Sequence, residues 1–108
     1  MSKVEDRRHA RYELQEPGFL RILGPPGGAF VITILDVSKR GMRIRCSRPL
    51  PEGTRVEVRC RNTPIIGEVR YTHGIDPEDV YMGVLAKSVA GVSADIDLTL
   101  LFPDLIRF

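Results

Sequence analysis

Two short segments of the chain alternate between apolar and charged residues with a strict period of two. Residues 42–46 read Met-Arg-Ile-Arg-Cys, and residues 55–60 read Arg-Val-Glu-Val-Arg-Cys. Successive side chains of a β-strand point to opposite faces, so this period predicts two strands, each with one buried and one solvated face. The chain is therefore expected to build a sheet around an apolar core.

Four further segments are short and rich in apolar or β-branched residues, and they too are predicted to be strands. They are residues 19–23, 30–35, 65–71 and 80–85. Clusters rich in glycine, proline and asparagine separate the six segments at residues 24–28, 49–53 and 62–64, and residues 72–79 are expected to form a loop. Six short strands at this spacing predict an all-β fold, an antiparallel barrel or sandwich.

The two ends of the chain differ from this pattern. Residues 1–12 are polar and rich in arginine, and they predict a flexible arm. Residues 93–102 predict a helix with Ser93 as its N-cap, with Ile96, Leu100 and Leu101 on one face, and with Pro103 ending it. We expect this helix to cover one mouth of the barrel.

Length and composition favour a single domain over residues 1–108, with the barrel at residues 18–86. The chain has 43% hydrophobic and 28% charged residues, no apolar run long enough to span a membrane, and a charged N-terminus unlike a secretion signal, so a cytoplasmic location is expected. Residues 1–70 contain 14 lysines and arginines against 8 acidic residues, whereas residues 71–108 contain 2 against 6. Such asymmetry can steer anions to one side of the molecule, although charged outward faces also serve solubility.

The sequence offers no catalytic or metal site. Cys46 and Cys60 fall at apolar-facing strand positions, and in a hairpin about residues 49–53 they would be staggered, so neither a disulfide nor a metal site is expected. His9 and His73 are far apart in sequence, and the glycine-rich segment 24–28 lacks the Lys-Ser/Thr of a P-loop. We therefore expect a protein that is not an enzyme.

One polar motif lies near the N-terminus, where Arg7 and Arg11 form an R-x-x-x-R pattern. Their Cα atoms would lie about 13 Å apart in an extended chain and about 6 Å apart in a helical turn. A guanidinium can bind a phosphate bidentately, stack on a purine, or donate to guanine O6 and N7. Taken alone, the pair is more simply interpreted as a solvated basic tail.

A second polar motif, Asp36-Val37-Ser38-Lys39-Arg40-Gly41, follows the apolar segment 30–35 and reads D-x-S-x-x-G. In an extended chain, Asp36 and Ser38 point to the same face. Asp36 could accept hydrogen bonds from a guanine edge or orient an arginine, Ser38 could donate to a phosphate, and Gly41 permits close approach of the backbone. The same residues also suit an ordinary tight turn.

The order of the two motifs resembles the PilZ family, the bacterial receptors for cyclic di-GMP. In that family an R-x-x-x-R arm precedes a barrel whose second strand ends in D/N-x-S-x-x-G and a hydrophobic residue, which is Met42 here. Residues 67–71 and 81–85 look like the later strands of the family. The resemblance covers the chain from about residue 5 to the C-terminal segment, and it implies a six-stranded antiparallel PilZ-like β-barrel.

The resemblance also implies a ligand site. Arg7 and Arg11 would wrap over cyclic di-GMP, with Arg8 beside them, and three residues would contact it from below: Asp36, Ser38 and Gly41. Tyr71, where relatives often have an aromatic residue, would stack on a guanine or belong to ordinary barrel surface. No other cofactor and no metal is implied.

The function expected on this basis is a cyclic di-GMP sensor that changes conformation and signals through a protein partner of the motility, exopolysaccharide or pilus machinery. One alternative is a PilZ-like adaptor that does not bind nucleotide. Another is a barrel that binds single-stranded nucleic acid. It would use the outward arginines of the two alternating strands, Arg43, Arg45, Arg55 and Arg59. Those strands carry no aromatic residue for base stacking, which disfavours nucleic acid as a partner.

Overall fold

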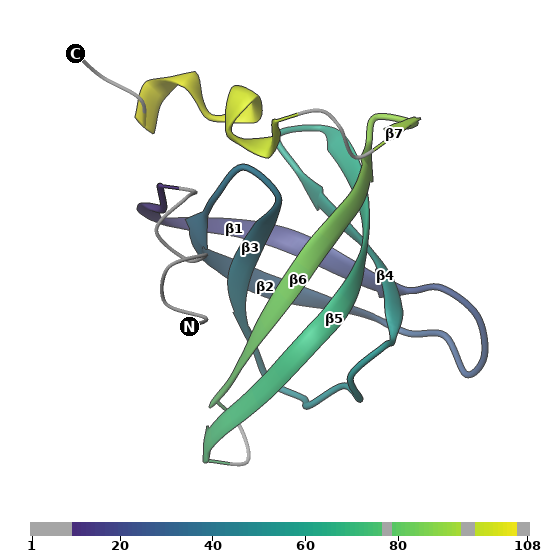
Figure 1. Ribbon diagram of the computed structural model, residues 1–108. Helices are drawn as coiled ribbons and strands as arrows, with labels where there is room; N and C mark the ends of the chain where they lie inside the picture. Colours follow the sequence, from purple (N-terminus) through teal and green to yellow (C-terminus); the bar gives the residue numbers. More distant parts are fainter. Residues whose placement is uncertain (1–9, 77–78, 94–96, 106–108) are drawn as a thin grey trace, which may run out of the picture.

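The computed structural model describes residues 10–76, 79–93 and 97–105, and most of their backbone is β-strand. The described residues form seven strands and two short 3-10 segments (Figure 1): β1 (Tyr12–Ile22), β2 (Ala29–Val37), β3 (Gly41–Cys46), β4 (Arg55–Cys60), β5 (Thr63–Asp76), β6 (Asp79–Val89), β7 (Val92–Ser93), η1 (Leu98–Leu101) and η2 (Pro103–Leu105). The two alternating segments are confirmed as β3 and β4.

The first six strands close into an antiparallel barrel. Hydrogen-bonded neighbours follow the order β3, β2, β1, β4, β5, β6, and β3 pairs in turn with β6. Closure provides each of these strands with a partner on both sides, which removes the exposed edges of an open sheet. The predicted six-stranded antiparallel barrel is confirmed, and β7 adds a short hairpin to the end of β6.

One apolar core fills the barrel, and all six strands contribute to it. In β3, for example, Met42, Ile44 and Cys46 are buried, while Arg43 and Arg45 lie on the outer face. Fully burying one large aliphatic side chain stabilises a fold by about 1.5–3 kcal/mol. The alternation in the sequence therefore determines which side chains of this strand face the core and which face solvent.

The strands β3 and β4 do not form a hairpin with each other, the arrangement considered for Cys46 and Cys60. Each of them pairs with other strands, β3 with β2 and β6, and β4 with β1 and β5. The connection between them crosses one end of the barrel (Figure 1), where Leu50 is buried and its carbonyl accepts a hydrogen bond from Thr72 Oγ1 at 2.6 Å. Because Leu50 anchors the connection in the core, the chain passes along the barrel rim and does not fold back on itself. Cys46 and Cys60 are both free and buried.

Several strands are longer than the sequence predicts, and the difference is largest in β1 and β5. β1 begins at Tyr12, not at residue 19, and Tyr12 and Leu14 pack partly against the core. Residues 72–76, predicted as part of a loop, continue β5, where Thr72 pairs with Met82 and His73 with Tyr81. Pairing with an apolar neighbouring strand outweighs the weak strand propensity of these polar segments.

The C-terminal segment is not the predicted α-helix over residues 93–102. Ser93 belongs to β7, and the segment that follows residues 94–96 is one 3-10 turn whose N-cap is Asp97, with its carboxylate accepting from the Thr99 amide. Of the predicted apolar face, Leu101 packs partly against the core, Leu100 is 67% exposed, and Ile96 lies outside the described residues. Leu98 and Phe102, which were not assigned to that face, are fully buried. Pro103 begins η2 and does not end the structure. Leu98 and Phe102 nevertheless join the core at one mouth of the barrel, which these turns cover (Figure 1).

None of the helical segments in the described part of the chain has the length and apolarity needed to cross a bilayer.

Candidate functional site

Two irregularities in strand register decide which residues face outward near the predicted site. Between β2 and β3, Ile34 lies opposite Ile44 and Asp36 opposite Arg43, which leaves Leu35 as an extra residue in β2. Such a β-bulge reverses the inward and outward alternation that follows it. Val37 is thereby buried in the core, and Asp36 lies on the outer face of the barrel.

A second β-bulge lies in β5, where Val69 lies opposite Val84 and Tyr71 opposite Gly83. Arg70 is the extra residue, and simple alternation from the buried Val69 would have turned Tyr71 into the core. With the bulge, Tyr71 stands on the outer face and is 46% exposed. The position of its ring on the barrel surface is therefore set by the register of two strands.

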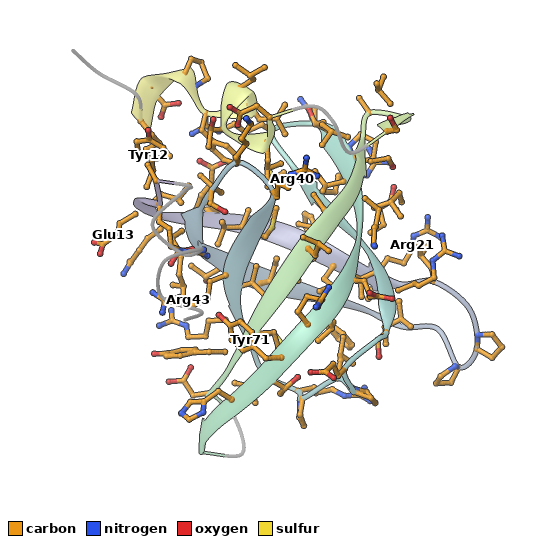
Figure 2. The ribbon with its side chains drawn as sticks, viewed as in Figure 1. Tyr12, Glu13, Arg21, Arg40, Arg43 and Tyr71 are labelled. Atoms are coloured by element: carbon orange, nitrogen blue, oxygen red, sulfur yellow. The ribbon has the colours of Figure 1, made fainter. Side chains whose placement is uncertain are left out.

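These registers place five residues in one row across the outer face of the barrel. Glu13 in β1 lies opposite Asp36 in β2, Asp36 opposite Arg43 in β3, Arg43 opposite Gly83 in β6, and Gly83 opposite Tyr71 in β5. Figure 2 shows Glu13, Arg43 and Tyr71 on the same side of the molecule. Residues from strands distant in sequence thus share one surface.

Asp36 holds two arginines on this surface. Its Oδ1 accepts a hydrogen bond from Nη2 of Arg11 at 2.7 Å, and its Oδ2 lies 3.1 Å from Nη2 of Arg43. Only 6% of the Asp36 side chain is exposed, compared with 49% for Arg11 and 43% for Arg43. A nearly buried carboxylate bonded to two guanidiniums keeps both of them close together and leaves their outer sides in solvent.

Ser38 and Gly41 form the tight connection between β2 and β3. The carbonyl of Gly41 accepts hydrogen bonds from the Ser38 amide at 2.8 Å and from the Ser38 hydroxyl at 3.3 Å. A Cβ on Gly41 would lie 2.8 Å from the carbonyl oxygen of Val84, so no larger residue fits without displacing β6. Glycine is therefore needed at this position because the backbone of the neighbouring strand lies too close to admit a side chain.

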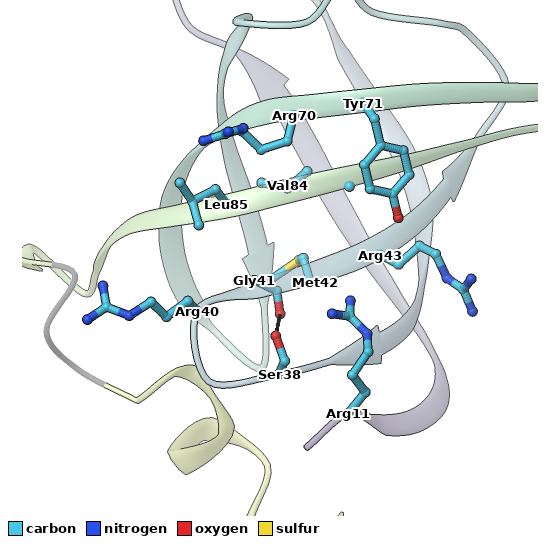
Figure 3. Close-up of a pocket in the computed structure, with 11 residues that line it drawn as sticks. Arg11, Ser38, Arg40, Gly41, Met42, Arg43, Arg70, Tyr71, Val84 and Leu85 are labelled. Atoms are coloured by element: carbon cyan, nitrogen blue, oxygen red, sulfur yellow. Dashed lines mark hydrogen bonds between the residues drawn. The ribbon is translucent and has the colours of Figure 1, made fainter. Parts of the chain in front are cut away.

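Two backbone hydrogen bonds hold the loop between Ser38 and Gly41 in place, one to β6 and one to η1. The carbonyl of Arg40 accepts from the amide of Ala86 in β6, and the carbonyl of Lys39 accepts from the amide of Leu98 in η1, each at 2.8 Å. These two bonds fix the loop against the barrel and against the C-terminal turn, and they direct the Arg40 side chain outward (Figure 3).

An open pocket of about 640 Å³ lies on this face (Figure 3). It brings together four of the residues singled out in the sequence, Arg11, Ser38, Gly41 and Tyr71. Asp36 lies beneath it through its contacts with Arg11 and Arg43. Arg7 and Arg8 lie outside the described residues.

Three arginines of the pocket were not among the residues predicted for the cyclic di-GMP site: Arg40, Arg43 and Arg70. Of these, Arg43 was named only in the alternative of a nucleic-acid surface. The alternation of β3 places Arg43 on the outer face, but its position beside Asp36 depends on the bulge at Leu35. Arg40 lies inside the D-x-S-x-x-G motif itself, at one of its variable positions. No pattern in the sequence points to Arg70, because its position at the pocket depends on the bulge in β5.

Tyr71 lies directly over Gly83. A Cβ on Gly83 would approach the Tyr71 ring to within 2.1 Å, so the missing side chain is the space that the ring occupies. The ring lies over β6 and lines the pocket, with Arg43 on the far side of Gly83 in the outer row (Figure 3). An exposed aromatic ring beside guanidinium groups can stack on a flat, electron-rich base.

The pocket is strongly cationic. Its described lining contains four arginines and no carboxylate, and the one acidic residue beneath it is already paired with two of them. Such a concentration of positive charge attracts anions and suits a ligand with more than one negative group. Among the residues described, no group of histidine, cysteine, aspartate and glutamate side chains is placed to hold a metal ion.

A nucleic-acid site built from the four outward arginines of β3 and β4 would require them to form one surface, and they do not. Since β3 and β4 are not neighbours, their outer faces are separated by two other strands in each direction around the barrel. Arg45 lies 3.7 Å from Asp79, and Arg59 lies 3.4 Å from Glu57, so acidic partners reduce the charge that each presents.

Comparison with known proteins agrees with this architecture. The sequence model of the PilZ domain family matches residues 5–85, three quarters of the chain, and the matched region includes both arginine and D-x-S-x-x-G motifs and all but the last residues of the barrel. A comparison with curated proteins gives no match. The barrel, the order of its motifs and the extent of this match lead to one conclusion: the chain belongs to the PilZ domain family.

Proposed function

We propose that this protein is a receptor for cyclic di-GMP and that the ligand binds in the cationic pocket on the outer face of the barrel. PilZ domains are a family of receptors for this dinucleotide. In the proposal, Arg11 binds a phosphate or a guanine, Ser38 and Gly41 line the floor, and Tyr71 stacks on a base. Asp36 supports the site from beneath.

The observation that carries the proposal is the pairing of the two motifs across 25 residues of sequence. Arg11, from the first motif, donates to Asp36, from the second, at 2.7 Å. A guanidinium in a disordered tail would have no such partner. Arg11 lines the pocket together with Ser38 and Gly41, so a dianionic ligand there could contact residues of both motifs at once.

The N-terminal segment completes the proposed site. Arg7 and Arg8 would contact the bound ligand, and charge-assisted hydrogen bonds would offset the entropy lost when their side chains are fixed. The surface changed in this way would recruit or release a protein partner. Hydrogen exchange of residues 1–10 with and without cyclic di-GMP tests this step, and equal exchange in both states contradicts it.

Isothermal titration with cyclic di-GMP tests the proposed function, using Arg11→Ala and Arg21→Ala as a matched pair. Arg21 also donates to a largely buried carboxylate at 2.7 Å, that of Glu57, but it lies on the opposite side of the barrel (Figure 2). We expect binding by the wild type and by Arg21→Ala, and a loss of about tenfold or more in Arg11→Ala, as for one charge-assisted hydrogen bond. No binding by the wild type, or equal binding by both variants, would overturn the proposal.

A thermal melt distinguishes the proposal from an adaptor that does not bind nucleotide. A ligand that binds only the native state stabilises it by about 2.7 kcal/mol at a concentration one hundred times its Kd. We therefore expect the melting temperature to rise with cyclic di-GMP and to stay constant with GMP at the same concentration. A melting temperature that cyclic di-GMP leaves unchanged supports the adaptor.

A further inference from the structure

Arg43 belongs to neither motif, yet it lies at the centre of the outer row. It is directly opposite Asp36 in β2 and directly opposite Gly83 in β6. Its Nη2 lies 3.1 Å from Asp36 Oδ2, while its Nε is buried and has no hydrogen-bond partner. Among the described residues, this is the one buried side-chain nitrogen or oxygen left without a partner.

We propose that Arg43 is a ligand-binding residue of this site and that Asp36 acts as a bracket that positions Arg43 and Arg11 together. This inference rests on the proposed function. It assigns the anionic phosphodiester group of the ligand to a pair of guanidiniums held by one carboxylate, and it assigns to Asp36 a positioning role.

The bonding of Asp36 supports the bracket. Each of its two carboxylate oxygens is engaged by a different arginine, one 2.7 Å and the other 3.1 Å away. With 4% of the residue exposed, Asp36 offers little surface to a ligand directly. Both arginines, in contrast, are nearly half exposed and line the pocket. Of the two roles that the sequence left open for Asp36, orienting an arginine therefore fits better than accepting from a guanine edge.

The surroundings of Arg43 support its contact with ligand. Gly83 presents no side chain on one side of it, and the space is taken by the ring of Tyr71 (Figure 3). Gly83 separates Tyr71 from Arg43 in the row, and the Tyr71 ring lies over Gly83. A base stacked on the ring would therefore bring its attached phosphate to the side on which Arg43 lies. An unpaired buried N–H is costly, so a small rotation of the side chain toward a ligand would gain a hydrogen bond without losing one at Nε.

Arg43→Met and Arg45→Met provide the test. Both arginines lie on the outer face of β3, two residues apart, and both are near an aspartate, but Arg45 does not line the pocket. Methionine retains the apolar stem and removes the charge. We expect Arg43→Met to weaken cyclic di-GMP binding by about tenfold or more, and Arg45→Met to stay within about twofold of wild type. The affinity of Arg43→Met should also depend less on salt than that of wild type, because one screened charge is gone.

Arg43→Lys and a double-mutant cycle with Asp36→Asn complete the test. Lysine retains the charge but cannot contact Asp36 and a phosphate through one planar fork, so its affinity should fall between those of Arg43→Met and wild type. If Asp36 acts through the arginines, the losses in Asp36→Asn and Arg43→Met should be less than additive. Additive losses would refute the bracket.

The outcomes separate this inference from the proposed function. Wild-type binding with unchanged affinity in Arg43→Met overturns the role of Arg43 and leaves the receptor standing. No binding by the wild type overturns both. If Arg43→Met does not fold in the absence of ligand, Arg43→Lys decides the role of Arg43, and a wild-type affinity in that variant overturns it.

Discussion

At the scale of single residues, glycines set the shape of the pocket by what they lack. Gly41 permits the close approach of β3 to the backbone of Val84, and Gly83 leaves the space that Tyr71 occupies. Neither glycine has a positive φ, so glycine is needed at these positions because a side chain would not fit and not because of the backbone conformation. Each is a position where the smallest possible side chain, one methyl group, has a measurable effect.

Gly83→Ala should therefore displace Tyr71 from its place over β6. A Cβ at this position would lie 2.1 Å from the ring, so the ring must move aside. Because Tyr71 is 46% exposed, the ring can do so at little cost in stability. Gly74→Ala is the control, because it lies in β5 of the same hairpin and its Cβ would have nothing within 4 Å. Urea denaturation should show similar stability for the two variants, whereas cyclic di-GMP should bind Gly83→Ala more weakly than Gly74→Ala. Equal affinity of the two variants would contradict a role for the position of the Tyr71 ring in binding.

The buried thiols give a second prediction at this scale. Desolvation raises the pKa of the Cys60 thiol to about 11 and also raises that of Cys46. Since the thiolate is the reactive form, both cysteines should react slowly with a disulfide reagent at pH 8 in the folded protein and quickly in denaturant. Fast reaction of both thiols in the folded protein would show that the core is more open than described.

At the scale of elements, ion pairs join strands that are far apart in sequence. Arg21 in β1 lies opposite Glu57 in β4 and donates two hydrogen bonds to one of its carboxylate oxygens, at 3.0 and 2.7 Å. Arg59 lies 3.4 Å from the other oxygen. The hydrogen bonds from Arg21, with a further contribution from Arg59, lower the pKa of Glu57 below its usual value.

The lowered pKa of Glu57 predicts how stability depends on pH. A carboxyl group with a lower pKa in the folded state stabilises the fold above its unfolded pKa, and this contribution is lost as pH falls through the folded value. The stability difference between wild type and Glu57→Gln should therefore be constant above about pH 5 and shrink below the ordinary glutamate pKa of 4.5. Glu52→Gln is the control, because Glu52 is exposed and makes no ion pair within the described residues. A difference that stays constant down to pH 3 would show that the pair contributes nothing.

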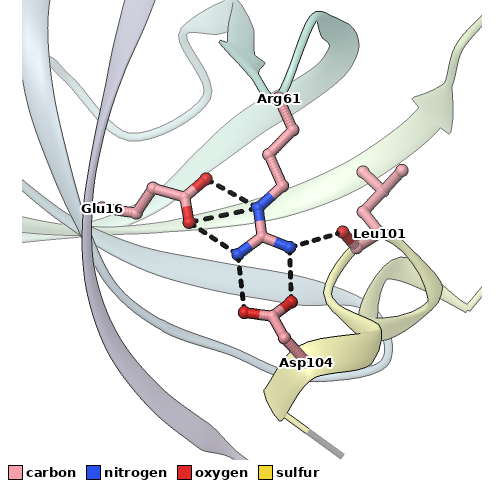
Figure 4. A network of polar contacts seen from close by, with 4 residues as sticks. All are labelled: Glu16, Arg61, Leu101 and Asp104. Carbon is pink, nitrogen blue, oxygen red and sulfur yellow. Dashed lines mark hydrogen bonds and ion pairs between the residues drawn. The ribbon is translucent and has the colours of Figure 1, made fainter.

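At the scale of the whole molecule, one arginine fastens the C-terminal turns to the barrel. Arg61, at the turn between β4 and β5, donates to Glu16 in β1 and to Asp104 and the Leu101 carbonyl in the 3-10 turns (Figure 4). Its guanidinium also lies 4.5 Å from the centre of the Phe102 ring, which is buried in the mouth of the barrel. The chain end is thus held by polar and apolar contacts together.

Removing the contacts of Arg61 should destabilise the protein. Arg61→Met loses a network of charge-assisted hydrogen bonds, and we expect a loss of roughly 1–3 kcal/mol in the free energy of unfolding. Arg55→Met, at the start of β4, is the control, because the described residues include no side-chain partner for Arg55. Urea denaturation measures both variants, and limited proteolysis should cleave the C-terminal turns faster in Arg61→Met alone. Equal stability of the two variants would contradict the role of Arg61.

The local pattern of the sequence was sufficient for the strands and the class of fold. Alternation identified β3 and β4, and turn residues marked the hairpin between β1 and β2 and that between β4 and β5. It failed where distant contacts outweigh local preference. Residues 72–76 extend β5 because they pair with β6, and residues 98–101 form a 3-10 turn because Asp97 caps it and Leu98 enters the core.

Five residues predicted for the candidate site, Arg11, Asp36, Ser38, Gly41 and Tyr71, lie together in the structure, while Arg7 and Arg8 lie outside the described residues. How these five come together could not be predicted from the sequence. By simple alternation Asp36 follows Ile34 and Tyr71 follows Val69 into the core, and only the bulges at Leu35 and Arg70 turn both outward. A bulge is a matter of register between two strands, and register is fixed by closing the barrel and filling its core, not by the residues on either side of it. The sequence alone determined which chemical groups the site has, and the tertiary structure decided which of them meet, with Arg43 among them.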